Sequence, residues 1–404
     1  MRISSLLLPV CLLGLQSCSL QERIDNVSSD VARQYADIQT WENLPLRTIS
    51  WNQAIAMMKR NNNSYIQAQN TIEKSNRDEM SVYTDLIPGV SFYSYFTRSL
   101  GDLTSKVNSS DFSNSVNVTF YLPSLTHVPY RVYASKARTY SAIMALKGKE
   151  RELTSTLYTL QRRQQINKRQ AELDSQKPDS TPDYHLKKRN DQAEQWMEIA
   201  TLLGDFSARW QILPASVPRF NWEKYRPHTD KLDELIVCKF AMELEQARMQ
   251  QYGIALTYLP TINMHLYSPS LFSSSGGTYS GTFLDKDDTK LNMSFNYSLD
   301  TDLHTWYSYR DSKEAYELCK RETTAKLIDL KQKLRTLRTS MDEYYTWKSF
   351  MNKRMEHLRT APATNAAEFL ENETTLQSMQ QELLRQEEAV IESEATLILQ
   401  YGLR

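Results

Sequence analysis

The sequence predicts a mainly α-helical chain with a small antiparallel β part, built from two copies of a helix, β-hairpin, helix unit. Apolar and polar side chains alternate over Thr261–Tyr267 and Lys290–Asp300, which is the pattern of strands with two different faces. The same pattern occurs roughly 170 residues earlier, over residues 90–96 and 115–122, and indicates an internal duplication. Because a lone hairpin is not stable in water, these strands need further strands as partners.

Composition favours long helices and gives no basis for nucleic-acid binding or catalysis. The chain has 404 residues, of which 24% are charged and 10 are Gly, a mixture typical of helices with solvated faces. Its 48 basic residues equal its 48 acidic residues, and it has no basic run interleaved with aromatics. The six His residues are scattered, and neither a metal-binding spacing nor a Gly-rich phosphate loop occurs. We therefore expect no nucleic-acid partner, no enzymatic activity, no metal and no cofactor.

Residues 1–17 have the pattern of a signal peptide. Arg2 supplies the positive start and residues 6–15 the apolar core, while residues 15–18, Leu-Gln-Ser-Cys, look like a lipobox. This predicts acylation of Cys18; the other interpretation is an ordinary cleaved signal peptide that contains Cys18. Ser19 in place of Asp favours sorting to the outer membrane of a bacterium. No later apolar run approaches the ~20 residues that a membrane-spanning helix needs.

The first half of the mature chain is expected to contain a tether and the first structural repeat. The polar residues 18–49 form the lipid-anchored tether, and residues 50–204 form the repeat. Ser50 suits the N-cap of its first helix, and Gly204 suits the end of its last. Between them we expect a helix to about Asp85, strands at about 89–99 and 114–123, a long helix over about 130–174 and a returning helix.

The second half repeats this order after an irregular segment. Residues 205–228 form that segment, in which Trp210, Trp222 and Tyr225 are expected to make a small core. The second repeat, 229–404, is expected to contain a helix to about Thr257, strands at about 261–272 and 289–300, a helix over about 304–359 and a final helix to about Gln400. Proline-containing tracts at 176–182 and 360–364 are expected to be the turns at the tips of the two helix pairs.

Two cysteines remain once Cys11 is removed with the signal peptide and Cys18 is acylated. Cys238 and Cys319 both fall in helical tracts. They are either small apolar residues on helix faces or the two halves of a disulfide, and the sequence leaves both interpretations open.

The order and duplication of these elements resemble the outer-membrane efflux proteins, the TolC-like channel-tunnels. The resemblance covers about 51–402 and includes the Ala-rich opening helix ending at Asn63, the strand-leading Pro88 and Pro260, and the tip region 365–376. The chain departs from the family in being short. The family's motif after the second strand of each half survives only as residues 121–125, Tyr-Leu-Pro-Ser-Leu.

The resemblance implies a homotrimer that is a passive export duct. Each chain would give four strands to one twelve-stranded barrel in the outer membrane and its helices to a hollow α-helical barrel in the periplasm. A shared barrel meets the physical requirements of a bilayer, because closed barrels can span it and four strands cannot close alone. A periplasmic adaptor protein and an inner-membrane transporter would be the partners, with the adaptor at the tip turns. Candidate contacts there are Ser180, Pro182, Pro362 and Ala363. Neither the exported substrate nor the transporter class follows from these residues.

The resemblance also implies a periplasmic gate. Residues 365–376 match the family's acidic motif, with Glu368 and Glu371 at its two acidic positions. Residues three apart share a helix face, so threefold symmetry would make two stacked carboxylate rings. The other interpretation is two exposed Glu on a solvated helix. The family's Gly and Arg around this turn are replaced by Pro362 and Thr364, so the contacts that close the mouth are not predicted.

A second class of function would explain the long helices but not the strands. A lipid-anchored periplasmic coiled-coil scaffold or adaptor without a pore would account for the long helical tracts. It would not account for four alternating strands in two matched pairs.

Overall fold

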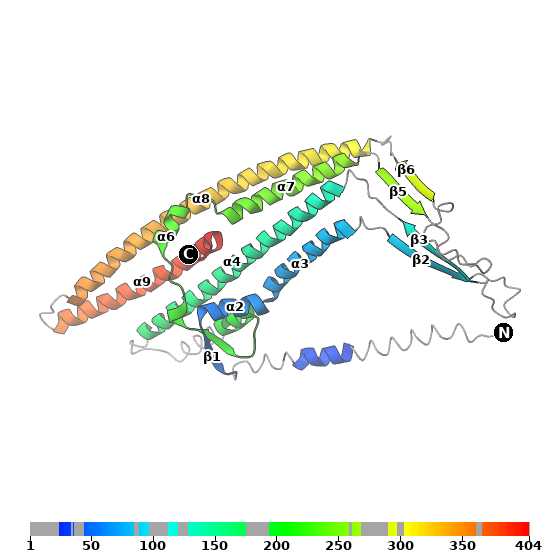
Figure 1. Ribbon diagram of the computed structural model, residues 1–404. Coiled ribbons are helices and arrows are strands. Elements are labelled where there is room, and N and C mark those ends of the chain that lie inside the picture. Colours follow the sequence, from blue (N-terminus) through cyan, green and yellow to red (C-terminus); the bar gives the residue numbers. More distant parts are fainter. Residues whose placement is uncertain are drawn as a thin grey trace. The chain divides into compact units, whose positions relative to one another are not determined.

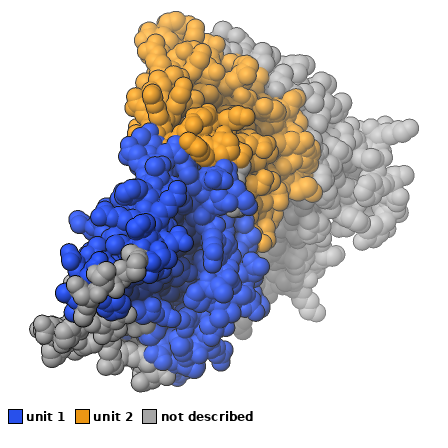
Figure 2. Space-filling view, turned by 90° about the vertical axis from the view of Figure 1, so that its left-hand side faces the viewer, with its two compact units in different colours: residues 1–66, 150–225, 339–404 blue, residues 67–149, 226–338 orange. Residues whose placement is uncertain are grey.

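The computed structural model is mainly helical, as the sequence predicts (Figure 1). It describes residues 24–33, 35, 44–84, 89–96, 112–119, 128–174, 194–257, 261–267, 290–296, 303–360 and 366–403. The chain divides into two compact units, coloured separately in Figure 2. Unit 1 contains Met1–Ile66, Glu150–Tyr225 and Thr339–Arg404, and unit 2 contains Gln67–Lys149 and Arg226–Arg338.

Long helices make up most of both units. At ~1.5 Å per residue, the 47 residues of α4 and the 57 residues of α8 correspond to roughly 70 and 85 Å. None of the helices in the described part of the chain is both long and apolar enough to cross a membrane. Besides a helix over residues 194–203, the main helices are α2 (Trp51–Asn61), α3 (Asn63–Thr84), α4 (Val128–Asp174), α7 (Glu234–Leu256), α8 (His304–Thr360) and α9 (Ala366–Tyr401).

The first predicted helix is in fact two helices that meet at Asn62. Ser50 caps α2 as expected, in a capping box with Gln53. At Asn62 the backbone turns extended, with φ −70° and ψ 119°. Its side-chain Oδ1 accepts hydrogen bonds from the backbone N–H groups of Ser64 (3.0 Å) and Tyr65 (3.2 Å), which caps α3. Asn favours such a cap over a helix interior, so the prediction of one continuous helix was wrong.

Gly204 ends the helix over residues 194–203, as the sequence predicts. Its φ is +67°, and its N–H donates to the Thr201 carbonyl (3.2 Å) while the Asp205 N–H donates to the Ala200 carbonyl (3.1 Å). A β-carbon at this position would lie 2.3 Å from the carbonyl oxygen of Asn61. Both the left-handed backbone and this close approach therefore require glycine.

The structure corrects two further expectations about helix and strand boundaries. The helix expected from 229 begins only at Glu234, because the Asp233 carboxylate accepts from the Leu235 N–H (3.1 Å) and caps it there. The segment expected to be a plain tether contains a helix over residues 24–33 and strand β1 (Leu46–Ile49). Strand β1 pairs in parallel with β4 (Arg209–Ile212), a long-range partner that local sequence does not reveal.

The three aromatic residues that the sequence predicts to make a small core in the segment between the repeats, Trp210, Trp222 and Tyr225, are buried. The indole N–H of Trp222 donates to Asp342 Oδ1 (2.8 Å), and the Tyr225 hydroxyl donates to the Gly402 carbonyl (2.9 Å). These bonds join the segment to α8 and to the end of α9 within unit 1. Its short helices are η4 (Pro214–Ser216), α6 (Trp222–Tyr225) and η5 (Arg226–His228).

The alternating segments form two antiparallel hairpins in unit 2. Strand β2 (Gly89–Phe96) pairs with β3 (Phe112–Thr119), and β5 (Thr261–Tyr267) pairs with β6 (Lys290–Asn296). The register sets apolar positions opposite one another, as in Val90 with Val118, Phe92 with Val116, Ile262 with Phe295 and Met264 with Met293. Strands β3 and β5 come close to each other, although each hairpin remains a separate two-stranded sheet.

Cys238 on α7 and Cys319 on α8 are both free and partly buried, so the disulfide interpretation is wrong. The reason lies in the register of these helices. Lys326 Nζ lies 3.6 Å from Glu243 Oε2, which sets the antiparallel helices side by side at that level. In this register the two cysteines are offset by about 12 residues, or ~18 Å along the axis, which is too far for a disulfide.

Candidate functional site

The start of α9 carries the two glutamates predicted to form a gate. Glu368 lies in the first turn of the helix and is partly buried, whereas Glu371 is exposed. Negative charge is favourable at a helix N-terminus. The Glu371 carbonyl accepts hydrogen bonds from the hydroxyls of Thr374 (2.9 Å) and Thr375 (2.7 Å). The other predicted site residues, Cys18, Ser180, Pro182, Pro362 and Ala363, lie outside the described residues.

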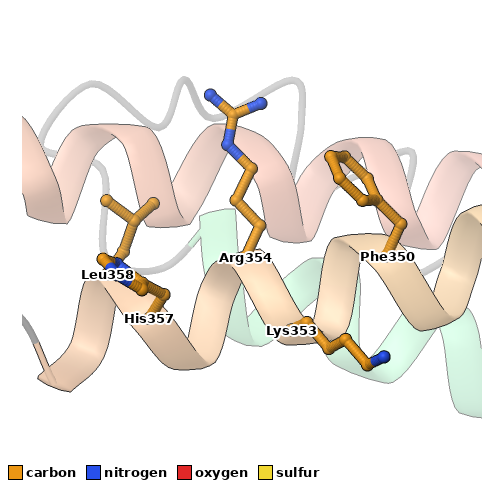
Figure 3. A pocket seen from close by; sticks show the side chains of 5 residues that line it. All are labelled: Phe350, Lys353, Arg354, His357 and Leu358. Carbon is orange, nitrogen blue, oxygen red and sulfur yellow. The ribbon is translucent and has the colours of Figure 1, made fainter.

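A cationic groove lies on α8, just before its C-terminal end (Figure 3). It has a volume of about 410 Å³ and is lined by Phe350, Lys353, Arg354, His357 and Leu358. Phe350 is 60% exposed, the three basic side chains are exposed and Leu358 is half-buried. Sequence reasoning missed this groove because basic residues on a charged helix suggest a solvated face. The available signal was the spacing of four residues from Phe350 to Arg354 and from Arg354 to Leu358.

A buried polar core lies in unit 1, where α4, α8 and α9 pack together. Glu394 and Glu387 of α9 are only 4% and 5% exposed. The hydroxyl of the fully buried Tyr158 on α4 donates to Glu394 Oε2 (2.7 Å). The Nε atom of Arg162, one helical turn further along α4, lies 3.7 Å from the same oxygen. Glu394 is thus held by one hydrogen bond and one ion pair.

Burial controls the protonation of Glu394 and Tyr158. Burial raises the pKa of Glu394 above its usual value, although the Tyr158 hydrogen bond and the Arg162 charge lower it. Burial also raises the pKa of Tyr158, and the Glu394 charge adds to this shift. The phenol therefore keeps its proton and remains the hydrogen-bond donor.

Glu387 joins all three helices. Its Oε1 lies 2.7 Å from Lys348 Nζ on α8, and its Oε2 lies 3.3 Å from an Arg169 guanidinium nitrogen on α4. A buried carboxylate with two cationic partners penalises any shift in helix register, because a shift would leave a buried charge unpaired. Apolar packing beside it is provided by Ile166, Leu173, Leu384 and Ile391.

Further contacts between α4 and α9 extend this register toward the end of α9. Arg151 donates to the Gln400 carbonyl (2.6 Å) and the Ser155 hydroxyl to the Ala395 carbonyl (2.7 Å). A surface ion pair joins Arg163 to Glu392. Within the described residues, no group of three His, Cys, Asp or Glu side chains is placed to hold a metal ion. The contacts of Glu387 and Glu394 across α4, α8 and α9 indicate that the polar core fixes helix packing.

Comparisons with known proteins identify the fold. No protein-family model matches the chain, and no curated protein sequence matches it. Among solved structures, the outer membrane protein VceC from Vibrio cholerae has a TM-score of 0.58 at 11% identity, over 87% of this chain and 95% of that one. CusC gives 0.54 at 12% identity, over 87% and 92% of the two chains. The open state of the Neisseria gonorrhoeae MtrE outer membrane channel gives 0.51 at 15%, over 87% and 89%.

Proposed function

We propose that this chain, which has the fold of the TolC-like outer-membrane channels, is the channel-tunnel of a tripartite efflux or secretion system. Cargo would pass through it passively from the periplasm to the exterior. One observation carries the proposal: two hairpins with matched apolar positions are held on long helices, in a chain that aligns over most of its length with outer-membrane channels.

The strands support a homotrimer. Within the described residues each hairpin is a two-stranded sheet, and β3 and β5 come close, so these hairpins offer four strands from one chain. Four strands cannot close on themselves, whereas twelve from three chains can. Closure satisfies every backbone hydrogen bond, which the hydrocarbon core of a membrane requires. In this arrangement the apolar positions opposite one another in each hairpin would face lipid, and the polar positions would face the lumen.

The remaining partners follow from this function. Acylation at Cys18 would anchor the chain to the outer membrane. An adaptor protein would contact the tip turns near Ser180, Pro182, Pro362 and Ala363 and connect the tunnel to an inner-membrane transporter, which supplies the energy.

Arginine at a lipid-facing position tests the barrel. Val118→Arg and Phe295→Arg should each cost about 2 to 4 kcal/mol near the bilayer midplane, and so reduce assembly of heat-modifiable trimers in outer-membrane fractions. Asn117→Arg and Asn263→Arg are matched controls. These residues belong to the polar set of alternating positions in the same hairpins, on the opposite face of the strands. Normal trimer assembly by both Val118→Arg and Phe295→Arg would refute the barrel.

The acidic positions at the start of α9 are proposed to be the periplasmic gate. Three copies of Glu368 and Glu371 would concentrate negative charge around the axis and bind divalent cations. The double change Glu368→Gln and Glu371→Gln should therefore weaken block by divalent cations added on the periplasmic side of a planar bilayer, most strongly at low salt. Unchanged block would show that Glu368 and Glu371 do not form the gate, and it would not bear on the barrel.

The alternative is a lipid-anchored coiled-coil scaffold or adaptor without a pore. The buried polar core, which fixes helix packing, suits a scaffold as well as a tunnel. Measurements in the membrane distinguish the two functions. A scaffold would give neither channel conductance nor a heat-modifiable oligomer.

A further inference from the structure

We infer that Lys290 sets the charge selectivity of the proposed barrel, favouring the passage of anionic and neutral solutes over cationic ones. The inference rests on the proposed channel and deepens it, because it names the charge class of cargo that the barrel favours. It starts from the register of the two hairpins, which sorts their residues into two faces.

The polar face of the hairpins consists of every second pair in each register. Successive residues of a strand belong to opposite faces, and residues paired across a hairpin share a face. In the proposed barrel this polar face would line the lumen. Its pairs are Gly89 with Thr119, Ser91 with Asn117, Tyr93 with Ser115 and Tyr95 with Ser113 in the first hairpin, and Thr261 with Asn296, Asn263 with Ser294, His265 with Asn292 and Tyr267 with Lys290 in the second.

This polar face carries almost no charge. Hydroxyl and amide residues occupy most of its sixteen positions, and within the described strands Lys290 is the one Asp, Glu, Lys or Arg among them. These four residue types make up 24% of the whole chain, which would correspond to about four of the sixteen positions. Because the rest of the face is polar but uncharged, the single lysine decides which sign of charge the face attracts.

Lys290 lies at the end of its hairpin that is remote from the helices. Strand β5 follows α7 and β6 leads into α8, so the hairpin begins beside the helices at Thr261 and reaches its far end at the pair of Tyr267 with Lys290. Tyr267 is the seventh residue of β5, ~20 Å along the strand from Thr261. With the helices in the periplasm, Lys290 would lie near the outer mouth of the barrel.

Threefold symmetry would turn Lys290 into three positive charges around the lumen. A ring of Lys or Arg favours anions in a pore, whereas a ring of Asp or Glu favours cations. The gate proposed at Glu368 and Glu371 follows the C-terminal end of α8, whereas Lys290 precedes its N-terminal end. At 0.1 M salt the Debye length is only about 10 Å, so the two sets of charges act independently. The charge of Lys290 can therefore be tested by itself.

Reversal potentials in a potassium chloride gradient across a planar bilayer measure this selectivity. Lys290→Gln should lower the permeability ratio of chloride to potassium on the order of fivefold at about 0.1 M salt, the effect of three charges ~10 Å from an ion on the axis. Lys290→Glu should lower the ratio by about the same factor again. Lys290→Arg keeps the charge and should leave the ratio unchanged. Recording at pH 8, where an ordinary imidazole is neutral, removes the contribution of a charged His265.

Thiol labelling checks that Lys290 lies on the lumen face. Cys238 and Cys319 are first changed to Ser, and Lys290→Cys is then treated with thiol reagents that add either a sulfonate or a quaternary ammonium group. The two reagents should shift the ratio of chloride to potassium permeability in opposite directions. Leu291→Cys is the matched control, because Leu291 is adjacent on β6 but belongs to the apolar set of alternating positions. Neither reagent should shift the ratio of this variant.

Comparison between variants keeps all other charges of the chain constant. These include three aspartates at positions 285, 287 and 288, which precede Lys290 in the sequence and lie outside the described residues. The shift between the wild type and Lys290→Gln therefore reports the contribution of Lys290, whatever the ratio of the wild type itself.

The outcomes separate the inference from the function it rests on. Chloride-to-potassium ratios in conducting Lys290→Gln and Lys290→Glu channels that equal or exceed the wild-type ratio would overturn the role of Lys290 and leave the channel. Equal responses of Lys290→Cys and Leu291→Cys to the two reagents would overturn that role too. A wild-type protein that gives no conductance would contradict both the inference and the channel.

Discussion

Tyr158→Phe is the most direct perturbation of the buried polar core. The substitution removes only the hydroxyl that donates to Glu394 Oε2 at 2.7 Å, and it leaves the ring in place. Glu394 is 4% exposed, so water cannot replace the lost donor. Leaving a buried carboxylate with one fewer partner costs about 1–3 kcal/mol, and a charged acceptor favours the upper part of this range. The free energy of unfolding should fall by that amount.

Urea denaturation of the detergent-solubilised protein measures this change. Tyr83→Phe is the matched control, because Tyr83 is 41% exposed on α3 and the same atom is removed. It should change the stability by less than about 0.5 kcal/mol. Hydrogen exchange should also speed up in α9 around Glu394. Equal stabilities and equal exchange for the two variants would refute the view that this hydrogen bond fixes the packing of α4 on α9.

Two further changes test the electrostatics and the backbone. Because burial raises the pKa of Glu394, the stability that its protonation contributes is complete below the ordinary value of 4.5 and is lost as pH rises through the raised pKa. The stability of the wild type relative to Glu394→Gln should therefore decrease from pH 4 to pH 8 in denaturation series, and an increase would contradict the raised pKa. Gly204→Ala should cost more than about 1 kcal/mol in thermal unfolding, because of its φ of +67° and the Asn61 carbonyl. Gly148→Ala, where a β-carbon meets nothing within 4 Å, should be neutral or stabilising by ~1 kcal/mol; equal losses would contradict this reasoning.

Local pattern was sufficient to predict the elements that depend on neighbouring residues. Alternation over 261–267 and 290–296 identified the second hairpin, and the observed register sets its apolar positions opposite one another. Gly204 could be predicted to end a helix because its left-handed backbone is a local signal for glycine, although the Asn61 carbonyl also requires it. The resemblance to TolC-like channels was confirmed at the level of the fold, at identities of 11 to 15%.

Features that depend on distant partners were not predictable in the same way. On its own helix, Glu394 looks like any of several solvated glutamates, and it becomes a buried acceptor only because α4 brings Tyr158 to it. Asn62 joins two helices, and its side-chain Nδ2 donates to the Leu202 carbonyl (2.8 Å), a residue 140 positions away. The parallel pairing of β1 with β4 has the same origin. At Glu394 and in the pairing of β1 with β4, tertiary contacts decide what local sequence does not, whereas at Asn62 they add to a local capping preference.

Single-channel recording on the purified mature protein in a planar bilayer tests the central claim most directly. Stepwise conductance is expected, and divalent cations should block it from the side exposing the start of α9. Its Val118→Arg variant, prepared in the same way, should yield far fewer insertions. A bilayer that shows no steps with the wild-type protein, while a known porin in the same chamber conducts, would contradict a channel and favour the anchored scaffold.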